Sequence, residues 1–422
     1  MSSRTCFGMT FGQFLIMRKQ LLLPLLILLF LIVGTTTVAL YAKGYRFLLQ
    51  GGKPHIAGTG LLVATSIPNG AEVLINGRLA TATDNTINLA PGEYLVKIQK
   101  DGYFPWEKKI IVKTEVVSKA EALLFPNAPK LESITSLGVE DPILDPSLTK
   151  IAYKVSTQSA KRNGIYVIDM TNRPILTLQN QATQIVDDVQ DIFSKASISF
   201  SPDASDVIAT SSSILGNRIT YQLKTNGYNP SPEDITDSLE LLGMQWQEQI
   251  EQKEKARLDS LKKILKEQIV QSFKVITYSP DETKILYIAS QSATLPIIIK
   301  PPIIGANSTP EDRKLNKDSI YIYDIKEDKN YKLEIGLLDY WIIGDYQKSQ
   351  LLVWFPDSKH LIYVHDKRIE IMEYDGLNRT VVYAGPFADS YVFPHPNASK
   401  IVILTNLNNP SIAPNLYTIS LK

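Results

Sequence analysis

Cysteine is almost absent from this chain of 422 residues, and the single one, Cys6, stands before the first long apolar run. The part of the chain after that run therefore has no internal disulfide, no cysteine-ligated metal cluster and no cysteine nucleophile. Cys6 also lies on the wrong side of the run for a lipoprotein-type modification. Cysteine usage thus excludes several chemistries and leaves the redox compartment open.

An excess of charge of either sign is also lacking, because 44 basic residues face 43 acidic ones. A domain that neutralises several phosphates usually shows a basic surface or a dense basic stripe. We therefore expect no nucleic-acid partner. The hydrophobic content of 44% and charged content of 21% are those of folded protein, and the length suffices for two or three domains.

Recognisable catalytic motifs are missing as well. The sequence has no Gly-x-Ser-x-Gly elbow and no Walker-type phosphate loop. His55 lies in a linker and His395 in a turn, whereas His360 and His365 are five positions apart in a strand context and so point to opposite faces. We predict no catalytic residue, no cofactor site and no metal site.

One uncharged apolar run stands out, from Leu21 to Ala42. At about 1.5 Å rise per residue, a helix of this length crosses a hydrocarbon layer about 30 Å thick. A cleaved signal peptide usually has a shorter apolar region that ends in an A-x-A-like site, so an uncleaved signal anchor is favoured. We expect residues 1–20 to form a short tail and residues 21–42 to span the lipid bilayer.

The charges that flank this run do not fix its direction. Three basic residues stand on each side: Arg4, Arg18 and Lys19 before it, and Lys43, Arg46 and Lys53 after it. We nevertheless expect a cytoplasmic N-terminus and extracytoplasmic C-terminal domains, partly because of the domain types that follow. Either Met1 or Met17 can serve as the initiator.

After a linker at residues 43–57, residues 58–126 consist of short apolar segments separated by turn dipeptides. Asn76-Gly77 is a strong hairpin signal, since both central residues of a type I′ turn need positive φ. Residues 94–99 alternate with the period of a half-buried strand. The segment is predicted to be a small all-β domain.

The same segment resembles a PEGA domain. Its name motif stands here as Pro68-Asn69-Gly70-Ala71, and its later signature as Pro91-Gly92-Glu93-Tyr94 followed by Gly102-Tyr103 and Trp106. Asn69 replaces the acidic residue of the motif, and Ala82-Thr83-Asp84-Asn85 stands in place of Gly-x-Thr-Pro. These residue types form turns and fill a small core. The resemblance implies a sandwich-like extracytoplasmic interaction or spacer module, not an enzyme.

Residues 130–422 contain five related segments, each with a Pro-Asp-type turn followed by an alternating strand. Their prolines are Pro146, Pro202, Pro280, Pro356 and Pro396. A second strand often follows, as at residues 164–169, 319–324, 369–375 and 415–419. Turn, strand, turn, strand is the pattern of a propeller blade, so we expect a β-propeller of five or six blades.

The repeat resembles that of TolB-like propellers, in which glycine usually follows Pro-Asp. Ala204, Glu282 and Ser358 occupy that glycine position here. An aspartate in such a turn generally accepts hydrogen bonds from its own backbone. We therefore expect structural roles, not metal ligation, for the preceding aspartates, which are Asp203, Asp281 and Asp357.

Residues 231–271 form an insertion with helical character. Ser231-Pro232-Glu233-Asp234 has the form of a helix start, and leucine, tryptophan and isoleucine side chains then recur on one side of a helical wheel. We expect a helix, or a helix pair broken near Gly243, inserted into the second blade. It either packs against the rest of the protein or projects as an arm that binds a partner.

The sequence thus predicts a mainly β protein with an N-terminal transmembrane helix, a small PEGA-like domain and a propeller. We expect a non-enzymatic scaffold of the periplasm or cell surface, which presents the propeller to protein or cell-envelope polymer partners. The alternative is an envelope hydrolase or lyase that uses a propeller pocket. A sensor that signals through the short tail bearing Cys6 is a third reading, with little chain available for it.

Overall fold

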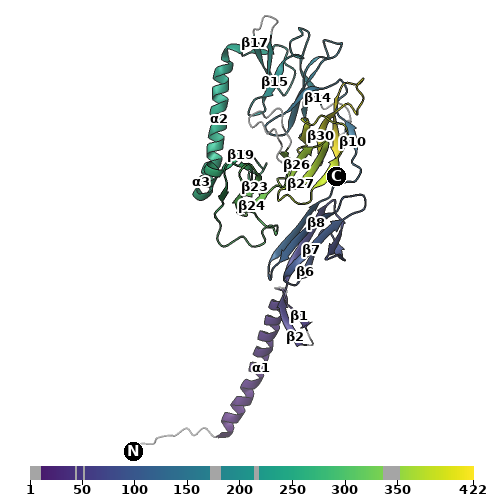
Figure 1. The fold of residues 1–422 in the computed structure, drawn as a ribbon. Helices are drawn as coiled ribbons and strands as arrows, with labels where there is room; N and C mark the ends of the chain where they lie inside the picture. Colours follow the sequence, from purple (N-terminus) through teal and green to yellow (C-terminus); the bar gives the residue numbers. More distant parts are fainter. Residues whose placement is uncertain (1–10, 43–44, 51–52, 172–181, 213–217, 336–351) are drawn as a thin grey trace, which may run out of the picture.

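The computed structural model describes residues 11–42, 45–50, 53–171, 182–212, 218–335 and 352–422 (Figure 1). In these residues the N-terminal helix, a small β domain and a larger β domain follow one another along an elongated molecule. The fold is mainly β, as predicted.

Helix α1 extends over Phe11–Ala42, so it begins within the predicted tail and not at Leu21. No proline occurs between Phe11 and Gln20, and nothing in that backbone ends the helix before the apolar run. The part from Pro24 to Ala42 is long and apolar enough to cross a membrane, with a mean hydropathy of 2.4, and it is not buried by protein.

A hairpin occupies the predicted linker. Strand β1 (Tyr45–Gln50) pairs antiparallel with β2 (Lys53–Gly58), and Tyr45 lies opposite Gly58. Since Tyr45 closely follows the end of α1, the hairpin brings the chain back to that end before it enters the small domain.

The small domain is a sandwich of a three-stranded and a four-stranded sheet. The first has the order β6-β3-β9, with β3 and β9 parallel, and the second has the order β5-β4-β7-β8. Their bounds are β3 (Gly60–Ile67), β4 (Glu72–Ile75), β5 (Arg78–Ala82), β6 (Asn85–Leu89), β7 (Gly92–Gln99), β8 (Trp106–Val112) and β9 (Val117–Leu123). Asn76 and Gly77 have φ of 49° and 79° between β4 and β5, as the predicted turn requires.

The larger domain contains five four-stranded antiparallel sheets in its described residues. The first is β11 (Glu140–Leu144), β12 (Lys150–Val155), β13 (Gly164–Asp169) and β14 (Ala182–Asp187); the second is β15 (Ser197–Phe200), β16 (Asp206–Ser212), β17 (Arg218–Lys224) and β18 (Glu233–Asp234). The third is β19 (Phe273–Tyr278), β20 (Lys284–Ala289), β23 (Ile320–Asp324) and β24 (Lys329–Lys332); the fourth is β25 (Leu352–Trp354), β26 (His360–His365), β27 (Arg368–Glu373) and β28 (Thr380–Tyr383).

The fifth sheet closes the domain on itself. It consists of β29 (Val392–Pro394), β30 (Lys400–Thr405) and β31 (Asn415–Ser420), and its outer strand is β10 (Leu131–Ser133) from the start of the domain. Neighbouring sheets share apolar cores, such as the one that joins Ile168 of the first sheet to Val402 of the last. This topology is that of a β-propeller whose two ends meet in one blade.

The helical segment differs from the prediction in three respects. It connects the second sheet to the third, and it begins later than expected, because Glu233 and Asp234 pair with β17 as a strand. After a short 3-10 turn (Thr236–Ser238), α2 runs over Leu239–Asp259 without a break at Gly243. The break comes at residues 260–262, before α3 (Lys263–Ser272), which leads directly into β19.

A second insertion lies in the third sheet between β20 and β23. It starts with a two-residue pairing of β21 (Ala293–Thr294) with β22 (Lys314–Leu315). Asp312 then lies beside Asn330 of β24, with mutual hydrogen bonds of 2.8 Å and 2.7 Å. The segment therefore follows the outer edge of the sheet, and its tip reaches the small domain, where Ile111 N donates to Ser308 Oγ at 3.1 Å.

Candidate functional site at the junction of the two β domains

The predicted turn aspartates serve their own turns. Asp203 Oδ1 accepts from Ser205 N at 3.1 Å and from Ser201 Oγ at 2.6 Å, and the latter bond is the main cause of the lowered pKa of Asp203. Asp281 accepts in the same way from Thr283 N and Ser279 Oγ, at 3.1 Å and 2.7 Å. None of these carboxylates lies in a group that could hold a metal among the described residues.

The first copy of the repeat makes the same contact with the two residue types exchanged. Asp145 stands where the second copy has Ser201, and Ser147 where it has Asp203. Asp145 Oδ2 accepts from Ser147 N at 3.0 Å, while its Oδ1 accepts from Thr149 N and Lys150 N at 2.6 Å and 2.5 Å. A carboxylate at either position can therefore hold the turn.

The four predicted histidines are not brought together. His360 Nδ1 lies 2.6 Å from Asp357 Oδ2 at the start of β26, and His365 Nε2 lies 3.0 Å from Glu370 Oε1 at its end. His395 Nδ1 accepts from Asn397 N at 3.4 Å in the turn of the fifth sheet, and His55 lies in β2. Each described imidazole thus contacts its own local partner.

A cluster of buried charged side chains lies where the small domain meets the propeller. Lys108 of β8 donates to Glu373 Oε2 at 2.6 Å and to Asp375 Oδ2 at 2.5 Å. The side chain of Lys108 is 10% exposed, and those of Glu373 and Asp375 are 9% and 0% exposed. We call these three residues the ionic joint. Either charge alone is costly to bury, so removal of one partner of this buried ion pair is strongly destabilising.

The pKa values within the ionic joint favour its charged form. Burial lowers the pKa of Lys108, but Glu373 and Asp375 outweigh it and the pKa of the ammonium group is raised. Burial raises the pKa of Asp375, but Lys108 outweighs it and the pKa of the carboxyl is lowered. A lysine held in its protonated form is neither a general base nor a nucleophile at neutral pH, so the geometry describes a structural joint.

Trp106 and Asn378 complete the joint at its rim. The indole Nε1 of Trp106 donates to Glu373 Oε1, which also accepts from Asn378 Nδ2 at 2.9 Å. Asn378 Oδ1 in turn accepts from the backbone nitrogen of Glu107 at 2.9 Å. Trp106 of the PEGA-like signature thus lies in the core of its own domain and also binds the propeller.

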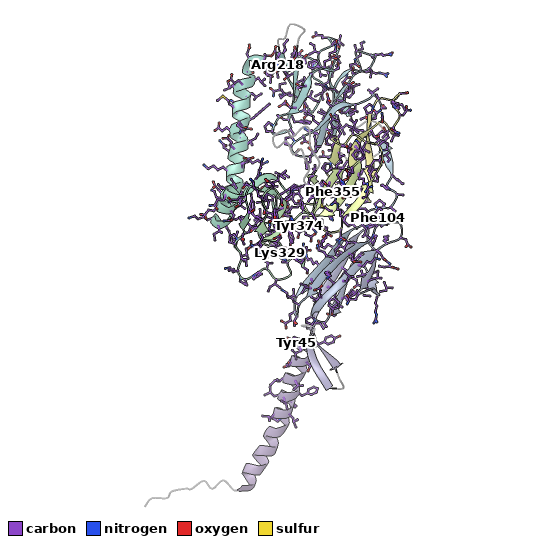
Figure 2. All side chains as sticks on the ribbon, in the orientation of Figure 1. Tyr45, Phe104, Arg218, Lys329, Phe355 and Tyr374 are labelled. Carbon is purple, nitrogen blue, oxygen red and sulfur yellow. The ribbon has the colours of Figure 1, made fainter. Side chains whose placement is uncertain are left out.

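The second insertion contributes a third partner to the joint. Thr309 Oγ1 and Asn307 Nδ2 donate to Asp375 Oδ2 at 2.6 Å and 2.8 Å, and Asn307 Nδ2 also donates to Tyr374 OH at 3.0 Å. Small domain, insertion and fourth sheet therefore converge on one carboxylate. Tyr374 lies close to this contact region in Figure 2.

Apolar side chains extend the junction beside the charges. Phe125 is buried in one cluster with Phe355 of the fourth sheet and Leu421 of the last, and Phe104 packs against the same cluster (Figure 2). Phe125 also meets the ring of His360 edge to face, at 6.3 Å between centroids. The small domain is thus joined to the propeller by both an apolar core and an ionic joint.

Two half-buried groups next to the joint have pKa values displaced toward their neutral forms. Burial raises the pKa of Glu327, which accepts from Asn307 N at 2.9 Å. Burial lowers the pKa of Lys329, whose ammonium donates to the carbonyl of Asn307. Such displacements often mark active sites, but here both groups support the backbone of the insertion.

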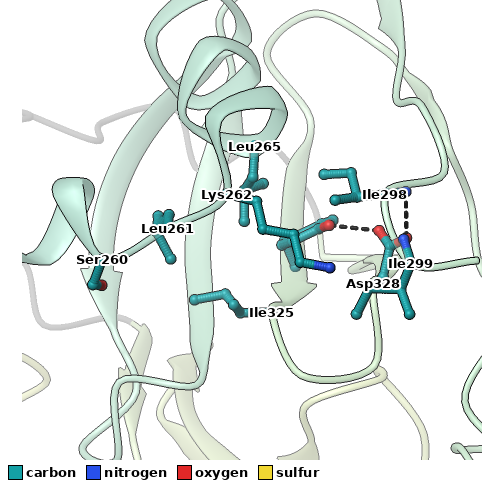
Figure 3. A pocket seen from close by; sticks show the side chains of 9 residues that line it. Ser260, Leu261, Lys262, Leu265, Ile298, Ile299, Ile325 and Asp328 are labelled. Atoms are coloured by element: carbon teal, nitrogen blue, oxygen red, sulfur yellow. Dashed lines mark hydrogen bonds between the residues drawn. The ribbon is translucent and has the colours of Figure 1, made fainter.

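A pocket of about 210 Å³ lies under the helical segment (Figure 3), lined by side chains of the break at residues 260–262, of α3, of the second insertion and of the third sheet. Asp328 is its one carboxylate, and it accepts from Ile298 N at 2.6 Å, Ile299 N at 2.7 Å and Tyr323 OH at 2.6 Å. Arg313 lies 3.3 Å from the same carboxylate. These groups already hydrogen-bond or pair with the carboxylate of Asp328. The pocket therefore presents apolar side chains and no unpaired carboxylate.

Sequence reasoning missed the ionic joint. Lys108 and Asp375 are 267 positions apart, and neither stands in a motif. The available signal was indirect: Trp106 in the PEGA signature marked the strand that carries the joint, and the strand at residues 369–375 was recognised as part of a repeat.

Comparison with known proteins identifies the family of the small domain. Residues 59–124 match the PEGA domain family, which confirms the predicted resemblance. Among curated proteins, none matches the sequence of this chain. Similar solved structures include a protein described as TolB from Agrobacterium tumefaciens, with 13% identity and a TM-score of 0.21, covering 66% of this chain and 79% of that one.

Two further structures have the same kind of likeness. TolB from Acinetobacter baumannii is 15% identical with a TM-score of 0.19, covering 78% of this chain and 60% of that one. A structure from a study of two prolyl endopeptidases is 9% identical with a TM-score of 0.21, covering 80% of this chain and 46% of that one. The propeller assignment itself rests on the sheet order and closing strand of this chain.

Proposed function

We propose that this protein is a membrane-anchored, extracytoplasmic binding scaffold that holds its propeller in a fixed orientation toward protein or cell-envelope polymer partners. The observation that carries this proposal is the ionic joint, which ties the propeller to the domain that directly follows the apolar helix. Separating these buried charges would leave each of them without its partner, so the joint opposes reorientation of the propeller relative to the small domain.

The anchor is part of the same proposal. The apolar segment at Pro24–Ala42 has the length and composition of a membrane span. It is followed by a PEGA domain at residues 59–124, so we place both β domains on one side of the membrane. With the N-terminus in the cytoplasm, that side is the periplasm or the cell surface.

The face of the propeller away from the small domain is the surface available to a partner. Phe125 packs with Ile419 and Leu421, so that end of β30 and β31 lies next to the small domain. The opposite end of these strands carries the loop at residues 406–414, in which Ile412 is 52% exposed. Binding residues are often found on loops that a rigid scaffold positions.

A binding function is favoured over a hydrolase or lyase. In the described residues, the carboxylates of the turns, the ionic joint and the pocket are engaged in hydrogen bonds or ion pairs that support the fold. A catalytic constellation would instead direct an acid, a base or a nucleophile into an open cavity.

Photocross-linking in the native cells tests the scaffold. A photoreactive residue at Ile412, on the far face, is expected to trap a defined protein or polymer adduct in the anchored full-length protein. Leu95, which is 39% exposed on the small domain, is the matched position and is expected to give no such adduct. Absence of adducts from a set of far-face positions, together with turnover of an envelope polymer by the purified protein, would contradict the proposal.

A further inference from the structure

The tip of the second insertion is an exposed apolar segment. Residues 300–305 read Lys-Pro-Pro-Ile-Ile-Gly and are exposed throughout. Ile303 is 42% exposed and Ile304 is 75% exposed. Single exposed apolar residues are ordinary on protein surfaces, but these two are adjacent at the tip of a long excursion.

The tip is seated on the small domain. A Cβ at Gly305, whose φ is +78°, would lie 3.1 Å from the carbonyl oxygen of Val117, so the backbone there approaches the start of β9 closely. Val117 is itself 46% exposed, and Ile111, whose backbone binds Ser308, is 44% exposed. We call Ile111, Val117, Ile303 and Ile304 the apolar tip surface.

This surface lies at the end of the small domain that follows the membrane helix. Val117 pairs with Leu61, close after the β1–β2 hairpin, and Leu61 N donates to Val116 O at 3.0 Å. Glu115 N donates to Thr59 O at 3.1 Å, and the side chain of Glu115 accepts a hydrogen bond from Tyr45, which raises the pKa of that tyrosine. Tyr45 closely follows the last residue of α1 and marks that boundary in Figure 2.

The charges around the apolar tip surface suit a lipid headgroup region. Lys300 at the tip and Lys113 in the turn before β9 are both exposed. Two acids lie nearby: Glu115, which is engaged by Tyr45, and Glu93 opposite Ile111 on β7, which pairs with Lys109 at 3.3 Å. Apolar side chains flanked by lysines are typical of protein segments that lie in the interface of a bilayer.

We infer that the apolar tip surface is a second membrane contact, in which Ile303 and Ile304 enter the lipid interface beside the end of α1. This inference rests on the proposed anchor and deepens it. One contact is made by the membrane span and the other by the insertion in the third sheet. Together they would fix the tilt of the propeller relative to the membrane plane, whereas the span alone leaves that tilt variable.

Site-directed fluorescence in vesicles tests this contact. The full-length protein with Cys6→Ser and Ile304→Cys is labelled with an environment-sensitive fluorophore and reconstituted in vesicles of phosphatidylcholine and phosphatidylglycerol. We expect a blue-shifted emission and quenching by nitroxide-labelled lipids. The matched control carries the same label at Ile412→Cys, on the far face, and is expected to show neither effect.

The outcomes separate this contact from the anchor. An alkaline carbonate wash reports on the anchor: release of the protein would overturn both the anchor and the second contact. Retention of the protein with an unquenched label at residue 304 would overturn the second contact alone. A third outcome is a blue-shifted emission that nitroxide-labelled lipids do not quench and that increases with protein density in the vesicles. It would show that the surface contacts a second copy of the chain, and it would likewise overturn the lipid contact.

Discussion

The glycine position of the repeat shows how single residues adapt to a fixed turn. Leu148, Ala204, Glu282, Ser358 and Ala398 occupy it, and all five have positive φ, between 51° and 60°. A residue with a Cβ pays about 1 kcal/mol or more for this left-handed conformation. The turn is therefore set by the surrounding sheet and by its capping side chain, and it forms here without a glycine.

Replacing Glu282 by glycine is expected to stabilise the protein. Glu282 has φ of 56°, and its side chain, which is 51% exposed, pairs with Arg257, which is 19% exposed. Removal of the Cβ relieves the left-handed strain, offset by the greater freedom of glycine in the unfolded chain, for a net gain of about 0.5–1 kcal/mol in the free energy of unfolding. Urea denaturation measures it. Glu282→Gln, which keeps the Cβ and removes the charge, is the control and should give no gain.

Glu327→Gln is expected to stabilise the protein at neutral pH and not in acid. Burial raises the pKa of Glu327 in the folded protein above its unfolded value, so the folded state binds more protons between the two values. Stability therefore falls as pH rises through that window, and it falls no further above it. Glutamine avoids this loss and still accepts from Asn307 N.

The test compares thermal unfolding of wild type and Glu327→Gln at pH 4 and pH 7. The variant should gain over wild type only at the higher pH. Glu334→Gln serves as the control, because Glu334 is 84% exposed. An equal change at both pH values would show that the carboxylate of Glu327 does not carry a burial penalty.

At the scale of elements, α2 and α3 behave differently although one apolar pattern runs through both. Leu265 and Ile269 of α3 are buried in the core of the third sheet, and Leu258 and Leu261 pack at its margin. No residue of α2 is buried, and the helix runs along the side of the propeller from the second sheet to the third (Figure 1). The helical segment is thus attached at its C-terminal end.

Alanine substitutions in α2 and in α3 should therefore differ in their effect on the free energy of unfolding. Leu265→Ala is expected to cost about 2–5 kcal/mol, because it opens a cavity in the core of the third sheet. Leu241→Ala in α2, where the side chain is 61% exposed, should change stability by less than about 0.5 kcal/mol. Chemical denaturation of the two variants measures both values. Equal losses would mean that α2 packs as firmly as α3.

These elements also show what the sequence could reveal. Alternating runs and turn dipeptides predicted strands such as β13 and β31 almost to the residue, because strand period and turn chemistry are local. The helix start at Ser231 was wrong, since pairing of Glu233 and Asp234 with β17 overrode a good local cap. The ionic joint stayed hidden because its partners meet only in the tertiary fold, and charged residues on a strand ordinarily face solvent.

For the whole molecule, the ionic joint is the feature that couples the two β domains. Lys108→Met is expected to destabilise the protein by about 3–5 kcal/mol, because it leaves two buried carboxylates without their cation. Lys109→Met is the matched control, since Lys109 is 75% exposed, and it should cost less than about 0.5 kcal/mol.

A rescue experiment separates charge from packing at the joint. Adding Glu373→Gln and Asp375→Asn to Lys108→Met should recover most of the lost stability, because the uncompensated charges are then removed. Unfolding of Lys108→Met in urea should also divide into two transitions, one for each β domain. A single transition with an unchanged midpoint would show that the joint does not couple the domains.

Protease accessibility tests whether the apolar helix holds both β domains outside the cytoplasm. Protease is added to intact cells whose outer envelope has been made permeable, and fragments are detected with tags at both ends of the chain. We expect the propeller to be digested while the N-terminal tag stays protected. A protected propeller that becomes accessible only after lysis of the inner membrane would contradict it.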